Sequence, residues 1–210
     1  FALIGRGLAS YIVIPMGDNG QQKNHLKAYG IAYWVLSQDV EVEWLLNYEG
    51  GSFLIKNLKP VTNECTIRNV SFSIISDSQA NSIKQTIADP QVNMDVMKLE
   101  KVPKIAVYSP KNKLPWDDAV TMVLTYAEIP YDVIYDKEIV DGNLHLYDWL
   151  HMHHEDFTGQ YGKFYSAYKN ASWYKKQVSQ LEESANNMGF EKVSDLKLQV
   201  ALNIKKFIAG

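Results

Sequence analysis

The sequence predicts an α/β protein with a mainly parallel, doubly wound sheet, and two observations support this fold class. Short runs rich in β-branched and aromatic residues alternate with segments whose apolar residues recur at helical spacing. The order strand, polar loop, helix, strand occurs twice, beginning at residues 11 and 104. Such alternation is typical of βαβ units, in which helices connect parallel strands through right-handed crossovers.

In the first half, the clearest elements are a strand and the helix that follows it. Residues 11–15 (YIVIP) are apolar throughout, which is typical of a strand in the middle of a parallel sheet. Asn24 can cap a mostly buried helix over 25–37. The other expected elements are strands over 40–46, 52–55, 70–75 and 94–99 and helices over 61–69 and 79–88.

The second half repeats the pattern and then becomes helical. The run 144–150 (LHLYDWL) has the hydrophobic and aromatic character of a strand. Ser172 and Ser194 are placed to begin two long helices, and Gly189 ends the first of them. The remaining expected elements are strands over 104–109 and 131–135 and a helix over 116–128.

Length and composition restrict the classes of protein that this chain can be. Its 210 residues allow one large domain or two small ones, with 46% apolar and 21% charged residues. The net charge of −3 and the lack of a lysine-arginine stripe argue against a nucleic-acid partner. No apolar run is long enough to span a membrane. The single cysteine, Cys65, excludes an internal disulfide and a CxxC metal site, and we expect it to be a bystander thiol.

The first ten residues, FALIGRGLAS, are apolar and rich in small residues. They fit the end of a secretory signal, which predicts a periplasmic or secreted protein. An N-terminal arm of a cytoplasmic protein is the alternative. We therefore expect a signal-peptide remnant or arm over 1–10, an α/β segment over 11–100 and a second α/β segment over 101–210.

A polar cluster follows the expected strand that ends at Leu150. The run 150–159 (LHMHHEDFTG) holds three of the five histidines and two carboxylates. If the backbone stays extended, alternation places His151, His153 and Glu155 on one face, where they are candidate ligands for a divalent metal.

Two other interpretations of this cluster remain open. His153, His154, Glu155 and Asp156 are candidate catalytic residues, because histidine exchanges protons near neutral pH and a neighbouring carboxylate can fix its tautomer. Alternatively, the histidines bond to the backbone at a strand end and an acid caps the following turn. The cluster matches no standard metal motif such as HExxH.

Other polar residues follow the expected strands at the same edge of a doubly wound sheet, where ligands bind in open α/β folds. Gly50 and Gly51 can let a ligand approach the backbone, although the pattern favours an ordinary tight turn. The expected ligand is a small polar molecule or a carbohydrate, and the oligomeric state is left open. The candidate substrate-binding residues are Asp18, Asn19, Tyr48, Gly50, Gly51 and Lys111.

Segment 103–210 resembles the front part of class I glutamine amidotransferase-like domains. The phrases KIAVYSP and AEIPYDVIYD and the strand that begins YDWL carry this resemblance. It implies a flavodoxin-like or class I glutamine amidotransferase-like fold. In such domains a helix of the type VALNIKKFIAG leads to a nucleophile elbow that carries cysteine. This chain stops at Gly210, so we expect a domain truncated before that elbow.

The whole chain resembles larger exported proteins labelled "asparagine synthetase B", through the phrases NHLKAYGIAYWVL, NYEGGSFL and HHEDFTGQYGKF. The SGGxDS loop and the N-terminal cysteine of genuine asparagine synthetases are not in this sequence. The resemblance implies a glutamine amidotransferase-like protein of unassigned activity that acts on an amide or another small polar substrate. The alternative is a non-catalytic carbohydrate- or peptide-binding module of the cell envelope.

Overall fold

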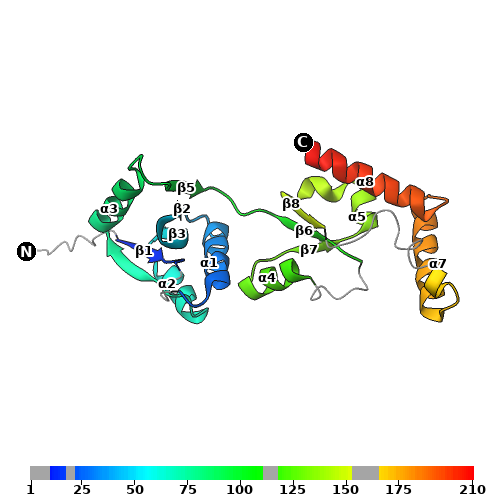
Figure 1. The fold of residues 1–210 in the computed structure, drawn as a ribbon, viewed down its shortest axis with the longest axis horizontal. Helices are drawn as coiled ribbons and strands as arrows, with labels where there is room; N and C mark the ends of the chain where they lie inside the picture. Colours follow the sequence, from blue (N-terminus) through cyan, green and yellow to red (C-terminus); the bar gives the residue numbers. More distant parts are fainter. Residues whose placement is uncertain (1–9, 18–21, 111–117, 153–165) are drawn as a thin grey trace, which may run out of the picture. The chain divides into compact units, whose positions relative to one another are not determined.

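The computed structural model describes residues 10–17, 22–110, 118–152 and 166–210 (Figure 1). The protein is mixed α/β and contains a five-stranded and a three-stranded sheet. The chain divides into two compact units, and each sheet lies within one of them. The first unit is Phe1–Val102 with Met122–Ile129, and the second is Pro103–Thr121 with Pro130–Gly210. No helix within the described ranges has the length and apolar character that a membrane span requires.

The first unit contains an antiparallel sheet in the strand order β4-β1-β3-β2-β5, and every neighbouring pair is antiparallel. Strands β1 to β4 and helices α1 and α2 follow one another in the order β-α-β-β-α-β, which is the split βαβ arrangement. The elements are β1 (Ser10–Ile14), α1 (His25–Ser37), β2 (Val42–Leu46), the 3-10 turn η1 (Tyr48–Gly50), β3 (Ser52–Lys56), α2 (Lys59–Ile67), β4 (Ser73–Ser76), α3 (Asp77–Ile87) and β5 (Asp95–Leu99).

The expectation of a mainly parallel sheet is therefore wrong for this unit. Strand β1 does lie inside a sheet, but its neighbours β3 and β4 both run antiparallel to it. The physical reason is the short connection between β2 and β3. A few residues can join only antiparallel neighbours, and the returning strand β3 then inserts between β1 and β2. The alternation of strands and helices along the sequence does not reveal this insertion.

The hairpin between β2 and β3 depends on glycine because its backbone touches the end of β1. Gly50 has a φ of +79°, and a Cβ atom added there would lie 2.3 Å from the Met16 carbonyl oxygen. The Met16 amide donates a hydrogen bond to the Glu49 carbonyl at 3.1 Å. On the other side, Trp44 Nε1 donates to the Gly51 carbonyl at 2.9 Å. The hairpin is thus held by a backbone bond to Met16 and a side-chain bond from Trp44.

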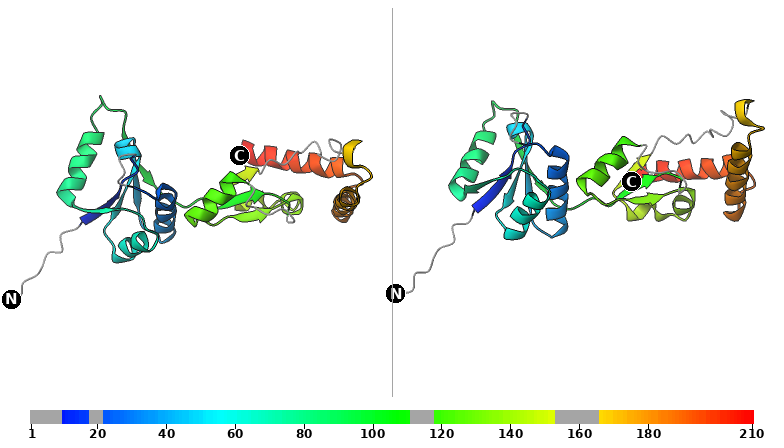
Figure 2. Two further views of the ribbon diagram at one scale, coloured as in Figure 1. Left: turned by 60° about the horizontal axis from the view of Figure 1, so that its bottom comes forward. Right: turned by 90° about the horizontal axis from the view of Figure 1, so that it is seen from below.

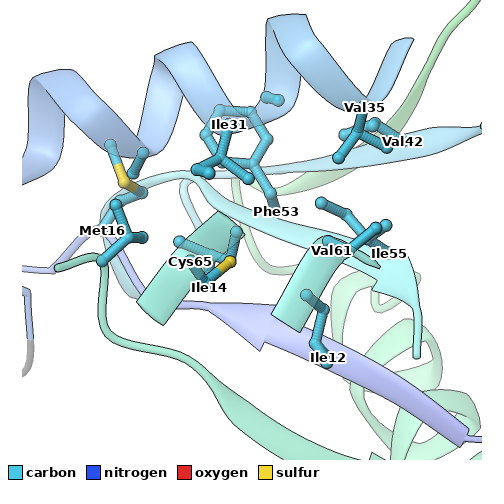
Figure 3. Packing of buried hydrophobic residues seen from close by; sticks show 13 residues of the cluster. Ile12, Ile14, Met16, Ile31, Val35, Val42, Phe53, Ile55, Val61 and Cys65 are labelled. Atoms are coloured by element: carbon cyan, nitrogen blue, oxygen red, sulfur yellow. The ribbon is translucent and has the colours of Figure 1, made fainter. Parts of the chain in front are cut away.

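Alternating residues of the strands supply two cores in the first unit. Helices α1 and α2 cover one face of the sheet (Figure 3), and α3 covers the opposite face (Figure 2). The first core includes Ile12, Ile14, Ile31, Val35, Phe53, Ile55, Val61 and Cys65, and the second includes Val13, Leu45, Leu54, Ala80 and Ile87.

The second unit contains a parallel sheet in the order β7-β6-β8, as the sequence predicts for this half. Within the register, Val107 lies opposite both Val133 and His151. The elements are β6 (Ile105–Tyr108), α4 (Ala119–Ala127), β7 (Asp132–Ile134), α5 (Asp136–Val140), the 3-10 turn η3 (Asn143–Leu146), β8 (Trp149–Met152), α7 (Ser172–Asn187) and α8 (Val193–Ala209). From Met122 onward, α4 groups with the first unit.

The strand expected over 144–150 begins only at Trp149, because the preceding residues form η3. Gly142 has a φ of +84° and turns the chain after α5. His145 Nδ1 lies 2.8 Å from the Gly142 carbonyl oxygen, and Leu144 is buried in the core. These interactions favour a tight turn over an extended backbone. The Lys104 amide then donates to Asp148 Oδ2 at 2.9 Å, which aligns β8 beside β6.

Helix α8 packs over one face of the parallel sheet together with α5, and a buried lysine joins it to the strand ends. Lys197 Nζ donates to Asp136 Oδ1 at 2.9 Å and to the hydroxyls of Tyr108 and Tyr135 at 3.0 Å each. The two tyrosine rings stack with centroids 5.0 Å apart. The surrounding apolar core includes Ala106, Ile139, Leu196, Val200 and Ile204.

We expect Gly50→Ala to lower the free energy of unfolding of the first unit by about 3 kcal/mol, since strain at positive φ adds to a backbone clash. The control is Gly142→Ala in the second unit. Gly142 has a similar φ but nothing within 4 Å of an added Cβ, so strain alone should cost about 1 kcal/mol. Urea denaturation followed by circular dichroism measures both values. Equal losses would show that the contact with Met16 does not matter.

Candidate functional site

The structure describes four of the residues that the sequence analysis singles out. Tyr48, Gly50 and Gly51 lie in the hairpin of the first unit, and His151 lies on β8 in the second. The other candidates lie outside the described residues and stay predictions: Asp18, Asn19, Lys111, His153, His154, Glu155 and Asp156.

Contacts within the first unit account for the conformation of the hairpin residues. Gly50 and Gly51 both have positive φ and both meet neighbouring groups, Met16 and Trp44 respectively. Tyr48 is half-buried and packs against the core beneath α3. Burial, and then the nearby Glu49 carboxylate, raise the pKa of Tyr48, so its phenol keeps its proton. The role of these three residues as ligand contacts stays a prediction.

A histidine–aspartate pair occupies the end of the parallel sheet in the second unit. His151 Nε2 lies 3.1 Å from Asp118 Oδ2, and the two side chains are 19% and 10% exposed. Asp118 immediately precedes α4, and its Oδ1 accepts hydrogen bonds from the amides of Val120 at 2.7 Å and Thr121 at 3.2 Å. One carboxylate therefore caps a helix and orients an imidazole at the same time.

The sequence analysis did not identify Asp118 as a site residue. An acidic residue at the start of an expected helix is a recognisable signal for a cap. No sequence signal shows that this cap also meets His151, which is 33 residues away in the chain. The two side chains meet only in the folded unit, where β8 pairs with β6 and Asp118 begins α4.

The electrostatics of the pair favour the charged form of the Asp118 carboxylate. Burial acts to raise the pKa of Asp118, but hydrogen bonds from His151, Thr121 and Val120 outweigh it, and the pKa is lowered overall. An ionised carboxylate only accepts hydrogen bonds, so the bond requires a hydrogen on His151 Nε2. In the neutral imidazole the lone pair then lies on Nδ1. That nitrogen can accept a proton or a hydrogen bond from a ligand.

A buried serine lies at the end of the neighbouring strand β6. The Ser109 amide donates to the Ile134 carbonyl at 3.0 Å, so its backbone continues the ladder with β7. Side chains alternate along a strand, which puts Ser109 on the same face as Val107 and its register partner His151. Ser109 is 2% exposed, and its hydroxyl has no hydrogen-bond partner in the described structure.

The structure does not test the predicted metal site. Within the described ranges, no group of three histidine, cysteine or acidic side chains is arranged to hold a metal ion. Two of the three expected ligands, His153 and Glu155, lie outside those ranges.

Cys65 belongs to the core of the first unit. It lies on α2, is fully buried and packs among apolar side chains. Burial raises the pKa of its thiol to about 11, with a further contribution from Glu64. A protonated, inaccessible thiol is neither a nucleophile nor a metal ligand.

Comparison with known proteins gives no family to which this chain can be assigned: no family model, no curated protein and no solved structure matches it. A functional assignment therefore depends on the geometry and chemistry of its own residues.

We expect Cys65 to react with a thiol reagent only when the first unit unfolds, because the thiol is buried and protonated. Labelling with 5,5′-dithiobis(2-nitrobenzoic acid) at pH 7.5 should be at least ~100-fold slower in the native protein than in 6 M guanidinium chloride. Rapid labelling of the native protein would contradict this placement of α2.

We expect Asp118→Asn to remove part of the acid sensitivity of the second unit. Because the folded state lowers the pKa of Asp118, its carboxylate stabilises the fold above the ordinary aspartate pKa of about 4, and this contribution is lost as the pH falls through the lowered value. The variant should be less stable at pH 7 by roughly 1 kcal/mol and approach wild type near pH 2.

Urea denaturation across this pH range measures the effect of Asp118→Asn. The control is Asp195→Asn, which removes an exposed carboxylate from the first turn of α8 in the same unit. Parallel stability curves for wild type and Asp118→Asn would show that the charged pair does not form.

Proposed function

We propose that the second unit binds a small polar substrate at the carboxyl edge of its parallel sheet, where His151 exchanges a proton with it. The observation that carries this proposal is the 3.1 Å contact between His151 Nε2 and Asp118 Oδ2. A positioned imidazole backed by a carboxylate is a general acid or base. The substrate class that agrees with the resemblance of segment 103–210 is an amide or another small polar molecule.

The strand order supports this placement. In a flavodoxin-like sheet of order 2-1-3-4-5, the order β7-β6-β8 corresponds to strands 2, 1 and 3. The ligand in such sheets lies beyond the carboxyl ends of strands 1 and 3, where the chain changes direction across the sheet. His151 lies on β8 and Ser109 directly follows β6, so both residues are at the corresponding strand ends. A class I glutamine amidotransferase-like fold is the interpretation that the sequence resemblance adds.

A non-catalytic carbohydrate-binding module is the second candidate, and Trp149 favours it. This side chain is 42% exposed and lies two residues before His151 on the same strand, hence on the same face. An exposed indole beside hydrogen-bonding groups is suited to stack on a sugar ring. Binding without turnover needs the hydrogen bonds of the site but no proton transfer.

We expect His151→Gln to weaken binding of polar ligands by at least ~10-fold, because a hydrogen-bonding group with its own fixed partner is lost. The wild-type chain is first tested against amides, amino acids and monosaccharides by thermal shift, and affinities are then measured by calorimetry. The matched control is His145→Gln, which alters an exposed histidine of the same unit. Ligand affinities that His151→Gln leaves unchanged would contradict the site.

Turnover separates the two candidates. For a ligand that depends on His151, release of ammonia or of a sugar by the wild-type chain supports the enzyme. Saturable binding with no product, and a loss of affinity in Trp149→Ala, supports the binding module instead.

A further inference from the structure

Strand β4 forms one edge of the five-stranded sheet, and its composition differs from that of the opposite edge. The opposite edge strand, β5, carries Asp95 and Lys98, and Lys98 pairs with Glu41 at 2.6 Å. Charged side chains on an edge strand hinder its pairing with other chains. The stretch 69–76 (NVSFSIIS), which ends with β4, contains no charged residue and no proline. This edge therefore lacks the usual protection against strand pairing.

Hydrogen bonds show which backbone groups of this edge face away from the sheet. The Ser10 carbonyl accepts from the Asn57 amide at 2.9 Å, so Ser10 faces β3 rather than β4. Ile12 faces β3 by alternation, and it is the register partner of Ile74. At such a position of an antiparallel pair, both residues turn their N–H and C=O groups away from each other. The backbone of Ile74 therefore faces outward.

The backbone of Phe72 faces outward as well. Gln22 Nε2 donates to the carbonyls of Ser71 at 3.2 Å and Pro15 at 3.4 Å, and the Ser71 amide donates to Gln22 Oε1 at 3.3 Å. Ser71 is thus bonded on the side of β1, and the next residue of an extended chain points the other way. Within the described ranges, the outward groups of Phe72 and Ile74 form no hydrogen bond.

The backbone at both ends of this stretch is already engaged. The Val70 amide donates to the Cys65 carbonyl at 2.7 Å, and the Ser76 amide donates to Gln79 Oε1 at 2.8 Å. The two outward-facing residues between them lie symmetrically about Ser73. A second copy of the same stretch can pair with both at once, in the isologous C2 arrangement that is commonest among homo-oligomers. A longer strand from another protein would find no further amide donor.

The side chains also suit a second copy of the same strand. In an antiparallel pair centred on Ser73, Phe72 of each copy lies opposite Ile74 of the other, and this aromatic and β-branched combination is favourable. Phe72 is half-buried against the core, whereas Ile74 is 60% exposed, so pairing removes an apolar side chain from water. Like charges opposite each other destabilise a strand pair. An uncharged stretch can therefore pair with itself without repulsion.

We propose that β4 pairs with β4 of a second copy of this chain, antiparallel and centred on Ser73, so that the two five-stranded sheets become continuous. Two residue pairs each exchange two hydrogen bonds across the two-fold axis. Such a small interface makes a weak dimer whose population depends on concentration. The interface lies in the first unit and does not depend on the function proposed for His151.

Sedimentation velocity of the full chain between ~5 and ~500 µM tests the dimer. We expect the wild type to change from monomer to dimer over this range, and Ile74→Lys to raise the dissociation constant at least tenfold. The matched control, Met97→Lys, changes a 45% exposed residue of the opposite edge strand and should leave the dimer unchanged. A wild type that stays monomeric, or a dimer that Ile74→Lys does not weaken, would overturn the proposal.

Charges at the two-fold axis test the register. Ser73→Lys and Ser73→Glu each place two like charges beside each other in the dimer, whereas an equimolar mixture of the two variants pairs opposite charges. We expect each variant alone to be monomeric where the wild type is dimeric, and the mixture to dimerise. Ser73 is exposed, so both variants should fold, which circular dichroism verifies. A mixture that sediments like the separate variants contradicts pairing through Ser73.

Hydrogen exchange provides a measurement on the wild-type chain alone, which decides the question even if every variant fails to fold. In dilute protein the amides of Phe72 and Ile74 bond only to water and should exchange rapidly. In concentrated protein they should exchange at least tenfold more slowly, because they join the second copy. Equal exchange at the two concentrations, with or without a dimer, would show that this edge is not the interface.

Discussion

The second unit depends on one buried charge, the ammonium of Lys197. An unpaired ammonium in a protein interior costs several kcal/mol, so the fold must supply partners from elsewhere in the chain. Here the three N–H groups meet Asp136 and the hydroxyls of Tyr108 and Tyr135. Tyr108 also donates to Asp136 at 2.5 Å. Helix α8 is consequently held to the ends of β6 and β7, in one position along the sheet.

The two faces of the parallel sheet carry different kinds of residue. The face that carries Ala106 and Tyr108 packs against α5 and α8 and forms the apolar core with the lysine cluster. The opposite face carries Val107, His151 and, by alternation, Ser109. Val107 is itself fully buried on this opposite face. The contact between His151 and Asp118 therefore lies beside apolar packing rather than on an uncovered surface.

Sequence patterns located most elements because their signals are local. The helix over 25–37 and the strands over 52–55 and 104–109 are found within one or two residues of their expected bounds. The element around 144 was misjudged because Gly142 and the side chain of His145 favour a tight turn that hydrophobicity alone does not show. The parallel sheet was correct for the second half and wrong for the first, where a short hairpin inserts β3 between β1 and β2. His151 is the one expected site residue of the second unit that the structure describes, and it lies beside Asp118.

The sequence by itself determined where most strands and helices form, that the chain has no internal disulfide, and that three histidines cluster over residues 151–154. These properties depend on residue type and on spacing over a few positions. Only the tertiary structure decided the direction in which strands pair, the partners of Lys197 and the contact between Asp118 and His151. Each of these interactions joins residues tens of positions apart. The free energy that favours them comes from burying apolar side chains and from pairing buried polar groups, and a short segment by itself can do neither.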